Sequence, residues 1–157
     1  MDIINSIISN RIMIAAGTSW LIAQVIKTII YAIIHKTIRL ERLTGDGGMP
    51  SCHSATVCAL ATATALTEGI NSSLFAIAFF FAVIVMHDAM GVRLETGKQA
   101  KILNELLAEF REKGMAMITM SPEERLKEFV GHTGSQVFVG AVIGVLVAIA
   151  SHFLIYS

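Results

Sequence analysis

The chain has 157 residues, with 12 acidic and 12 basic side chains and a formal net charge of zero. Apolar residues make up 54% of it, charged residues only 15%, and the mean hydropathy is +0.68. Such values lie outside the usual range of soluble domains, and a net charge of zero gives no indication of nucleic-acid binding. The length fits a single domain, residues 1–157.

Four apolar segments predict four helices, in chain order. The first covers residues 13–34 after a short amphipathic start, and Lys27 is the one cation within it. The second covers residues 51–67, which is short enough to be either re-entrant or fully spanning. The third covers residues 74–92, and the fourth, residues 135–156, carries no charge. Because about 20 apolar residues cross a bilayer, we predict an all-α integral membrane protein with about four transmembrane helices.

A polar segment, residues 93–131, separates the third and fourth apolar segments. Within it, residues 98–113 place leucines and a phenylalanine on one helical face, and Gly114 is a typical helix end. The sequence Ser-Pro-Glu-Glu at residues 121–124 is a capping box, which predicts a short helix to about Val130. We expect these two helices to lie on the membrane surface as a cytoplasmic cap.

The distribution of cations predicts the orientation of the chain. The loop at residues 35–49 holds three Lys and Arg side chains and segment 93–131 holds seven, whereas Arg11 is alone on the opposite side. Because cytoplasmic loops of membrane proteins are enriched in these residues, both basic segments are expected in the cytoplasm. Three polar clusters should then meet at that membrane face: residues 47–54, 87–99 and 131–136.

The sequence Gly-Gly-Met-Pro-Ser-Cys-His-Ser precedes the second helix. Gly47 and Gly48 allow close approach of the backbone, and Ser51 and Ser54 offer capping hydroxyl groups. His53 lies at the beginning of the helix, where unpaired N–H groups attract phosphate. We interpret this stretch as part of a phosphate-binding site.

A second histidine, His132, has a similar setting, because it follows Gly131 and precedes the fourth helix. A helix N-terminus disfavours a protonated imidazole and so favours a neutral nucleophile, whereas a bound phosphate reverses this preference. His53 and His132 together therefore suit hydrolysis of a phosphomonoester through a phosphohistidine. The alternative is that both are capping histidines at the membrane interface.

Four charged residues could complete such a site. Asp88 could orient a catalytic imidazole and Arg93 could bind phosphate through its planar guanidinium. The alternative is a structural ion pair of Asp88 with Arg93 or Lys27. The Lys27 side chain either extends to the interface or, on the same face as Gln24, points into the bundle to neutralise a phosphate. Lys98 is expected to line the cap side of the site.

Two other pairs of residues are interpreted as structural. Cys52 and Cys58 lack the spacing of a metal site or a redox motif, so we expect both to be packing residues. Gly140 and Gly144 have the small-residue spacing that permits close packing of membrane helices.

Taken together, the polar clusters resemble the divergent type 2 phosphatidic acid phosphatase family, also described as acid phosphatase or vanadium-dependent haloperoxidase-related membrane proteins. The resemblance covers nearly the whole chain. It is carried by Gln24-x-x-Lys27, residues 47–54, Asp88-x-x-Gly91-Val92-Arg93, Gly97-x-Gln99-Ala100, Asn104 and Gly131-His132. Pro50-Ser51-Cys52-His53 is similar to a Pro-Ser-Gly-His motif of the related phosphatases, which implies that His53 is a general acid. Their Arg-Pro motif is absent, and no histidine follows Arg93 at the distance that their Ser-Arg…His motif has, so His132 would supply the nucleophile from a different place.

The leading hypothesis is a phosphatase that hydrolyses a lipid phosphate monoester or diphosphate, such as phosphatidate or a polyprenyl phosphate. In this hypothesis His132 attacks phosphorus, Asp88 orients it and His53 protonates the leaving oxygen. The expected location is the plasma membrane, the inner membrane in a bacterium, with the site on the cytoplasmic side. The alternative is a transporter or binding protein that holds an anionic lipid or small anion without chemistry, and a scaffold with a relict phosphate site is a third hypothesis.

No cofactor is expected, because this scheme needs no metal. Three carboxylates could nonetheless bind Mg²⁺, namely Asp46, Asp88 and Glu95. The expected partners are the bilayer and a lipid phosphate. Nucleic acid is not expected, and formation of a homo-oligomer is left open.

Overall fold

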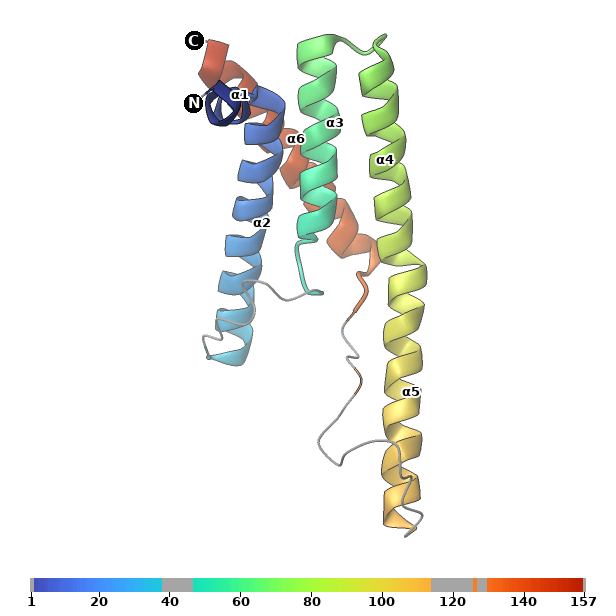
Figure 1. Ribbon diagram of the computed structural model, residues 1–157. Helices are drawn as coiled ribbons and strands as arrows, with labels where there is room; N and C mark the ends of the chain where they lie inside the picture. Colours follow the sequence, from blue (N-terminus) through green and yellow to red (C-terminus); the bar gives the residue numbers. More distant parts are fainter. Residues whose placement is uncertain (1, 38–46, 114–125, 127–129, 157) are drawn as a thin grey trace.

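The computed structural model describes residues 2–37, 47–113, 126 and 130–156 (Figure 1). Every regular element in these residues is an α-helix, which confirms the all-α prediction. The helices are α1 (Asp2–Ile8), α2 (Arg11–His35), α3 (Cys52–Glu68), α4 (Ser73–Met90), α5 (Val92–Glu112) and α6 (Gly134–Tyr156). The apolar runs thus predicted the bounds of α2, α3 and α6 to within two residues.

Three stretches of the described residues are long and apolar enough to cross a membrane: Arg11–His35, Ser73–Phe110 and Gly134–Leu154. The second of these combines α4 with most of α5. α3 has 17 residues, a length of roughly 25 Å at 1.5 Å per residue, and it is one continuous helix. The membrane-spanning character of α2, α4 and α6 is therefore supported, whereas a fourth crossing by α3 stays a prediction.

α3 forms the centre of the bundle and packs against α2, α4 and α6. Its buried positions are mostly small residues such as Ala55 and Ala59, both with no exposed surface. Gly140 and Gly144 of α6 face this helix so closely that an added Cβ would overlap the carbonyl oxygens of Ser51 and Ala55. The predicted close packing through these glycines is confirmed, and it occurs within the chain.

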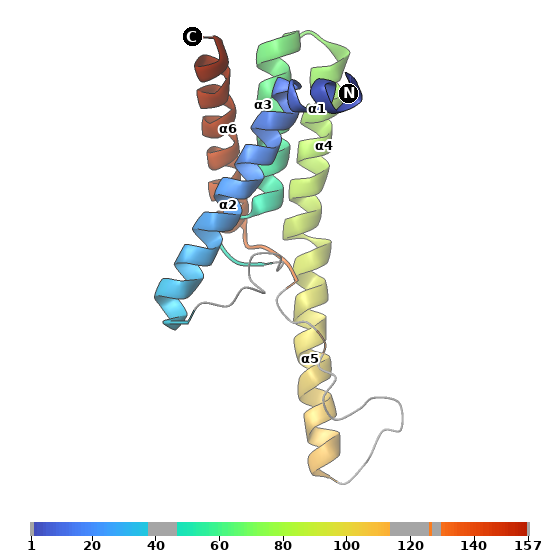
Figure 2. The same ribbon diagram turned by 60° about the vertical axis from the view of Figure 1, so that its left-hand side comes forward.

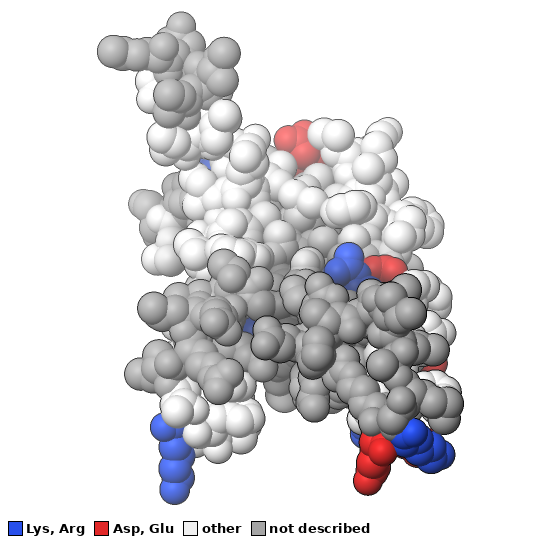
Figure 3. Space-filling view, turned by 60° about the horizontal axis from the view of Figure 1, so that its bottom comes forward, with Lys and Arg blue, Asp and Glu red and all other residues white. Residues whose placement is uncertain are grey.

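The bundle has two ends, and the connections between helices are distributed between them. Both termini and the short turn between α3 and α4 lie at one end, whereas the C-terminal end of α2 and the whole of α5 lie toward the other (Figures 1 and 2). Seen from the second end, the described charged side chains do not gather in one place: some stand at the lower corners of the view and one blue and red pair lies to the right of its centre (Figure 3). The described parts of the two basic segments, residues 35–37 and 93–113, therefore lie toward the same end, as the cation count predicted.

The segment after α4 differs from the prediction. α5 begins at Val92, directly after Gly91, and continues in line with α4 away from the bundle (Figures 1 and 2). It does not fold back as a cap. Helical hydrogen bonds reach Gly91 from both sides, because its N–H donates to the carbonyl of His87 at 2.9 Å and its carbonyl accepts from the N–H of Glu95 at 3.0 Å. The predicted capping box at residues 121–124 lies outside the described residues.

One described contact ties the returning chain to α5. The side chain of Asn104 donates to the carbonyl of Leu126 at 3.0 Å and accepts from its N–H at 3.1 Å. An amide that bonds both backbone groups of one residue fixes the position of that residue. Leu126 is thereby held beside the middle of α5.

Candidate functional site

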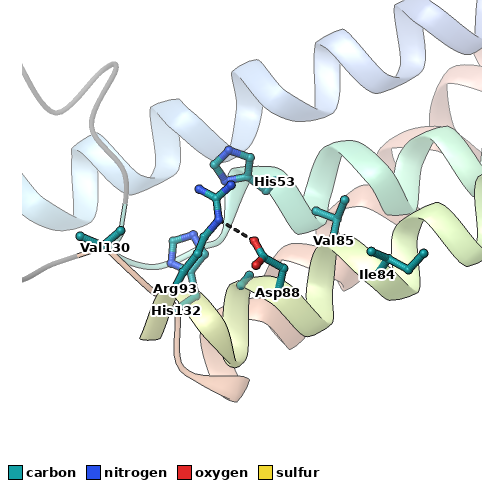
Figure 4. A pocket seen from close by; sticks show the side chains of 8 residues that line it. His53, Ile84, Val85, Asp88, Arg93, Val130 and His132 are labelled. Carbon is teal, nitrogen blue, oxygen red and sulfur yellow. Dashed lines mark hydrogen bonds and ion pairs between the residues drawn. The ribbon is translucent and has the colours of Figure 1, made fainter. Parts of the chain in front are cut away.

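A cavity of about 200 Å³ lies where α3, α4 and the beginning of α5 meet the segment that leads into α6 (Figure 4). Its lining residues are His53, Ile84, Val85, Asp88, Ala89, Arg93, Val130 and His132. The structure therefore brings together one residue or more from each of the three polar clusters of the sequence. Four of the predicted site residues, the two histidines and the Asp88–Arg93 pair, line this one cavity.

The two histidines face each other across the cavity. Their ring centroids are 6.3 Å apart and the ring planes are inclined by 46° (Figure 4). His53 lies in the first turn of α3. His132 is only 4% exposed, and its backbone N–H donates to the carbonyl of Ala89 at 3.1 Å. At this separation both imidazoles can contact one phosphoryl group.

Gly131 explains how His132 comes so close to α4 and α5. A Cβ at this position would overlap the backbone of Leu94 and the carbonyl carbon of Arg93. Only glycine fits against a helix backbone at such a distance. The segment before α6 is therefore pressed against the α4–α5 junction, and this contact carries His132 into the cavity.

Asp88 and Arg93 form an ion pair at the mouth of the cavity. The Nε of Arg93 lies 2.7 Å from Oδ2 of Asp88, and the side chains are 48% and 40% exposed (Figure 4). This is the structural ion pair that the sequence left open as the alternative. Because the contact uses Nε, the two terminal amino groups of the guanidinium are still able to donate to an anion.

Lys27 lies behind the cavity and points into the bundle, with only 4% of its surface exposed. Its Nζ donates to Sγ of Cys52 at 3.4 Å, and its aliphatic stem passes beside Gly48. Of the two orientations considered from the sequence, the interior one is confirmed. Cys52 was interpreted from the sequence as a packing residue, but its Sγ also lies 3.9 Å from Nδ1 of His53. In the sequence, the feature that could have indicated this contact is that Cys52 directly precedes His53.

Ser51 and Ser54 have no exposed surface. The Oγ of Ser51 accepts from the N–H of Ser54 at 3.3 Å and from its hydroxyl at 3.0 Å. Gly140 of α6 covers both residues. In this arrangement the two hydroxyl groups cap α3 and face α6. Neither serine lines the cavity, so the cavity gives no support to the prediction that they bind phosphate.

The remaining predicted phosphate ligands line a second hollow of about 620 Å³, which contains Gly47, Gly48 and Lys98. Gly47 and Gly48 adopt φ values of 79° and 86°, a region that favours glycine. Lys98 forms an ion pair of 2.6 Å with Glu95. The single composite site of the sequence analysis is therefore divided into two neighbouring hollows, with the segment around Gly131 and His132 contributing to both.

The described residues contain no group of three or more His, Cys, Asp and Glu side chains that could hold a metal ion. Of the three carboxylates considered for Mg²⁺, Asp46 lies outside the described residues. Asp88 and Glu95 are each paired with a cation. The geometry of the described part thus gives the magnesium alternative no support.

The fold and the cavity define a helical membrane protein with a paired-histidine site at one end of its bundle. The chain belongs to the Divergent PAP2 family, whose sequence profile matches residues 8–147. It is 37% identical over 149 residues to an uncharacterized membrane protein of Bacillus subtilis (strain 168), YuiD, a match that covers 91% of this chain and 94% of that protein. No solved structure matches the chain. The resemblance inferred from the polar clusters is confirmed.

Proposed function

We propose that the protein is a phosphatase of the membrane that hydrolyses a lipid phosphate monoester or diphosphate. One observation carries the proposal: His53 and His132 lie 6.3 Å apart in a cavity that Arg93 also lines. Two imidazoles beside a guanidinium provide a nucleophile, a proton donor and an anion ligand in one place. Membership of a phosphatase-related family supports the same class of reaction.

The wall of the cavity supports a lipid as the substrate. Ile84, on α4, is 65% exposed and forms part of the lining. α4 is one of the helices apolar enough to cross the membrane, so we expect this side of the cavity to face hydrocarbon. Asp88 and Arg93 lie at its polar end, as a head group at the interface would require. A phosphate on an acyl or prenyl chain suits such a boundary better than a freely soluble phosphate.

In the proposed reaction a neutral nitrogen of His132 forms a bond to phosphorus while the bond from phosphorus to the lipid oxygen breaks. The departing oxygen takes a proton from His53. A water molecule then attacks the phosphohistidine and gives its proton to His53, the N–P bond breaks, and inorganic phosphate leaves. Arg93 stabilises the charge that develops on the phosphoryl oxygens. Asp88 keeps the guanidinium in place through its contact with Nε.

The test is phosphate release by the purified protein from phosphatidate, a polyprenyl phosphate and a polyprenyl diphosphate, with a chelator and with Mg²⁺. We expect His53→Ala to lower release by at least about 100-fold, the usual contribution of a general acid, and His132→Ala to lower it at least as much, because that variant lacks the nucleophile. His152→Ala is the matched control, because His152 lies near the other end of α6. Absence of release from every lipid would contradict the proposal, and binding of a lipid phosphate without release would favour the non-catalytic alternative.

A further inference from the structure

Lys27, Cys52 and His53 form a chain of contacts directly behind the cavity. The Nζ of Lys27 lies 3.4 Å from Sγ of Cys52, and this sulfur lies 3.9 Å from Nδ1 of His53. Lys27 and Cys52 are each only 4% exposed. The chain therefore joins α2 to the catalytic end of α3 through side chains shielded from water, and the proposed reaction assigns no task to Cys52.

The contact between the buried Lys27 side chain and the thiol of Cys52 has an electrostatic reason. An ammonium group in apolar surroundings is costly unless an anion or several acceptors contact it. The acidic group in contact with this ammonium is the thiol of Cys52. Lysine next to cysteine is a usual way to stabilise a thiolate.

We propose that Cys52 is a positioning residue for His53, acting as a thiolate that Lys27 stabilises. The thiolate accepts a hydrogen bond from Nδ1–H, fixes the tautomer and leaves Nε2 as the nitrogen that exchanges protons in the cavity. The catalytic meaning of this contact rests on the proposed function, whereas the contact itself does not. The other titratable groups that face His53 are His132, Asp88 and Arg93, which line the same cavity.

A negative charge beside Nδ1 stabilises the protonated form of His53. That is the form which the proposed reaction uses to protonate the leaving oxygen. Without the thiolate, His53 should lose its proton at a lower pH, and the alkaline limb of the pH profile for kcat should move in the same direction.

Nuclear magnetic resonance of the detergent-purified full chain with labelled histidine tests this independently of activity, with the His53 signal assigned by its loss in His53→Ala. We expect Cys52→Ala and Cys52→Ser to shift the midpoint of the His53 titration down by about 1 pH unit. Cys58→Ser is the matched control, because Cys58 lies on the same helix and its Sγ contacts Sδ of Met86 at 3.7 Å. An unchanged midpoint in Cys52→Ala, with the helical content retained, would overturn the proposal.

The ultraviolet absorbance of the thiolate gives a second measurement, made on Cys58→Ser so that Cys52 is the one thiol present. We expect the thiolate signal at neutral pH, its loss in Lys27→Met and its retention in Lys27→Arg. Absence of the signal in Cys58→Ser alone would refute the assignment. A protein that has the thiolate and the shifted His53 titration but releases no phosphate contradicts the proposed function and leaves the positioning contact in place.

Discussion

The imidazoles of His53 and His132 lie 6.3 Å apart although one belongs to the first turn of α3 and the other precedes α6. Two glycine contacts produce this approach. Gly140 lets α6 lie against the beginning of α3, and Gly131 lets the preceding segment lie against the backbone of Leu94. The geometry of the candidate site is therefore a consequence of helix packing. Substitution of either glycine should change it in a measurable way.

Gly140→Ala and Gly144→Ala should destabilise the bundle. The added methyl groups would overlap the carbonyl oxygens of Ser51 and Ala55, and overpacking of this kind costs about 1–3 kcal/mol. Gly17→Ala is the control, because no atom lies within 4 Å of its added Cβ. Thermal unfolding in detergent should show lower stability for the two α6 variants alone. Equal stability of all three variants would contradict the packing.

Gly131→Ala should displace His132 without unfolding the protein. Its methyl group would overlap the backbone at the beginning of α5, so the segment that holds His132 must move away. We expect kcat for phosphate release to fall by about 10-fold or more, because small displacements of a catalytic group are costly. In Gly134→Ala the methyl group meets only Sδ of Met90, at 3.8 Å, and this control should retain its activity.

Ser51→Ala should lower stability while leaving substrate binding unchanged. The hydroxyl of Ser51 caps α3 and contacts Ser54 in a fully buried position, and loss of such a cap costs about 1–2 kcal/mol. Ser72→Ala removes a comparable but only partly buried cap from α4 and should cost less. A large increase in KM for Ser51→Ala would instead revive the prediction that this hydroxyl binds phosphate.

Arg93→Gln should weaken substrate binding much more than it weakens the fold. The ion pair with Asp88 is half exposed, and such pairs contribute less than about 1 kcal/mol to stability. Loss of a charge-assisted contact to phosphate should raise KM by about 10-fold. Lys113→Gln, beyond the end of α5 and exposed, is the control for a general loss of positive charge. An unchanged KM in Arg93→Gln would remove Arg93 from the site.

Cysteine labelling of intact cells should establish the orientation. In a background with Cys52→Ser and Cys58→Ser, a cysteine replacing Asn71 should react with an impermeant reagent from outside. One replacing Lys113 should react only after permeabilisation, because α5 projects from the end opposite the α3–α4 turn (Figure 1). Labelling of position 113 in intact cells would place the histidine cavity outside the cytoplasm.

The helices were predictable from the sequence because their signals are local. An uninterrupted apolar run and a capping residue such as Ser51 define where a helix begins whatever its neighbours do. The course of the chain after α4 was predicted wrongly: the sequence placed the next helix at residues 98–113 as a cap on the membrane surface, whereas α5 begins at Val92 and continues in line with α4. Whether the chain bends at Gly91 depends on the surrounding packing.

The sequence by itself also determined that His53, His132 and the Asp88–Arg93 pair would meet, because the order of helices and the distribution of cations place all of them at one end. Only the tertiary structure decided which neighbours of His53 share its cavity. Successive residues of a helix point about 100° apart, so Ser51 and Ser54 turn to α6 while Cys52 turns to Lys27. The rotation of α3 that produces this division is set by the glycines of α6 and the buried lysine of α2, which are contacts between distant parts of the chain.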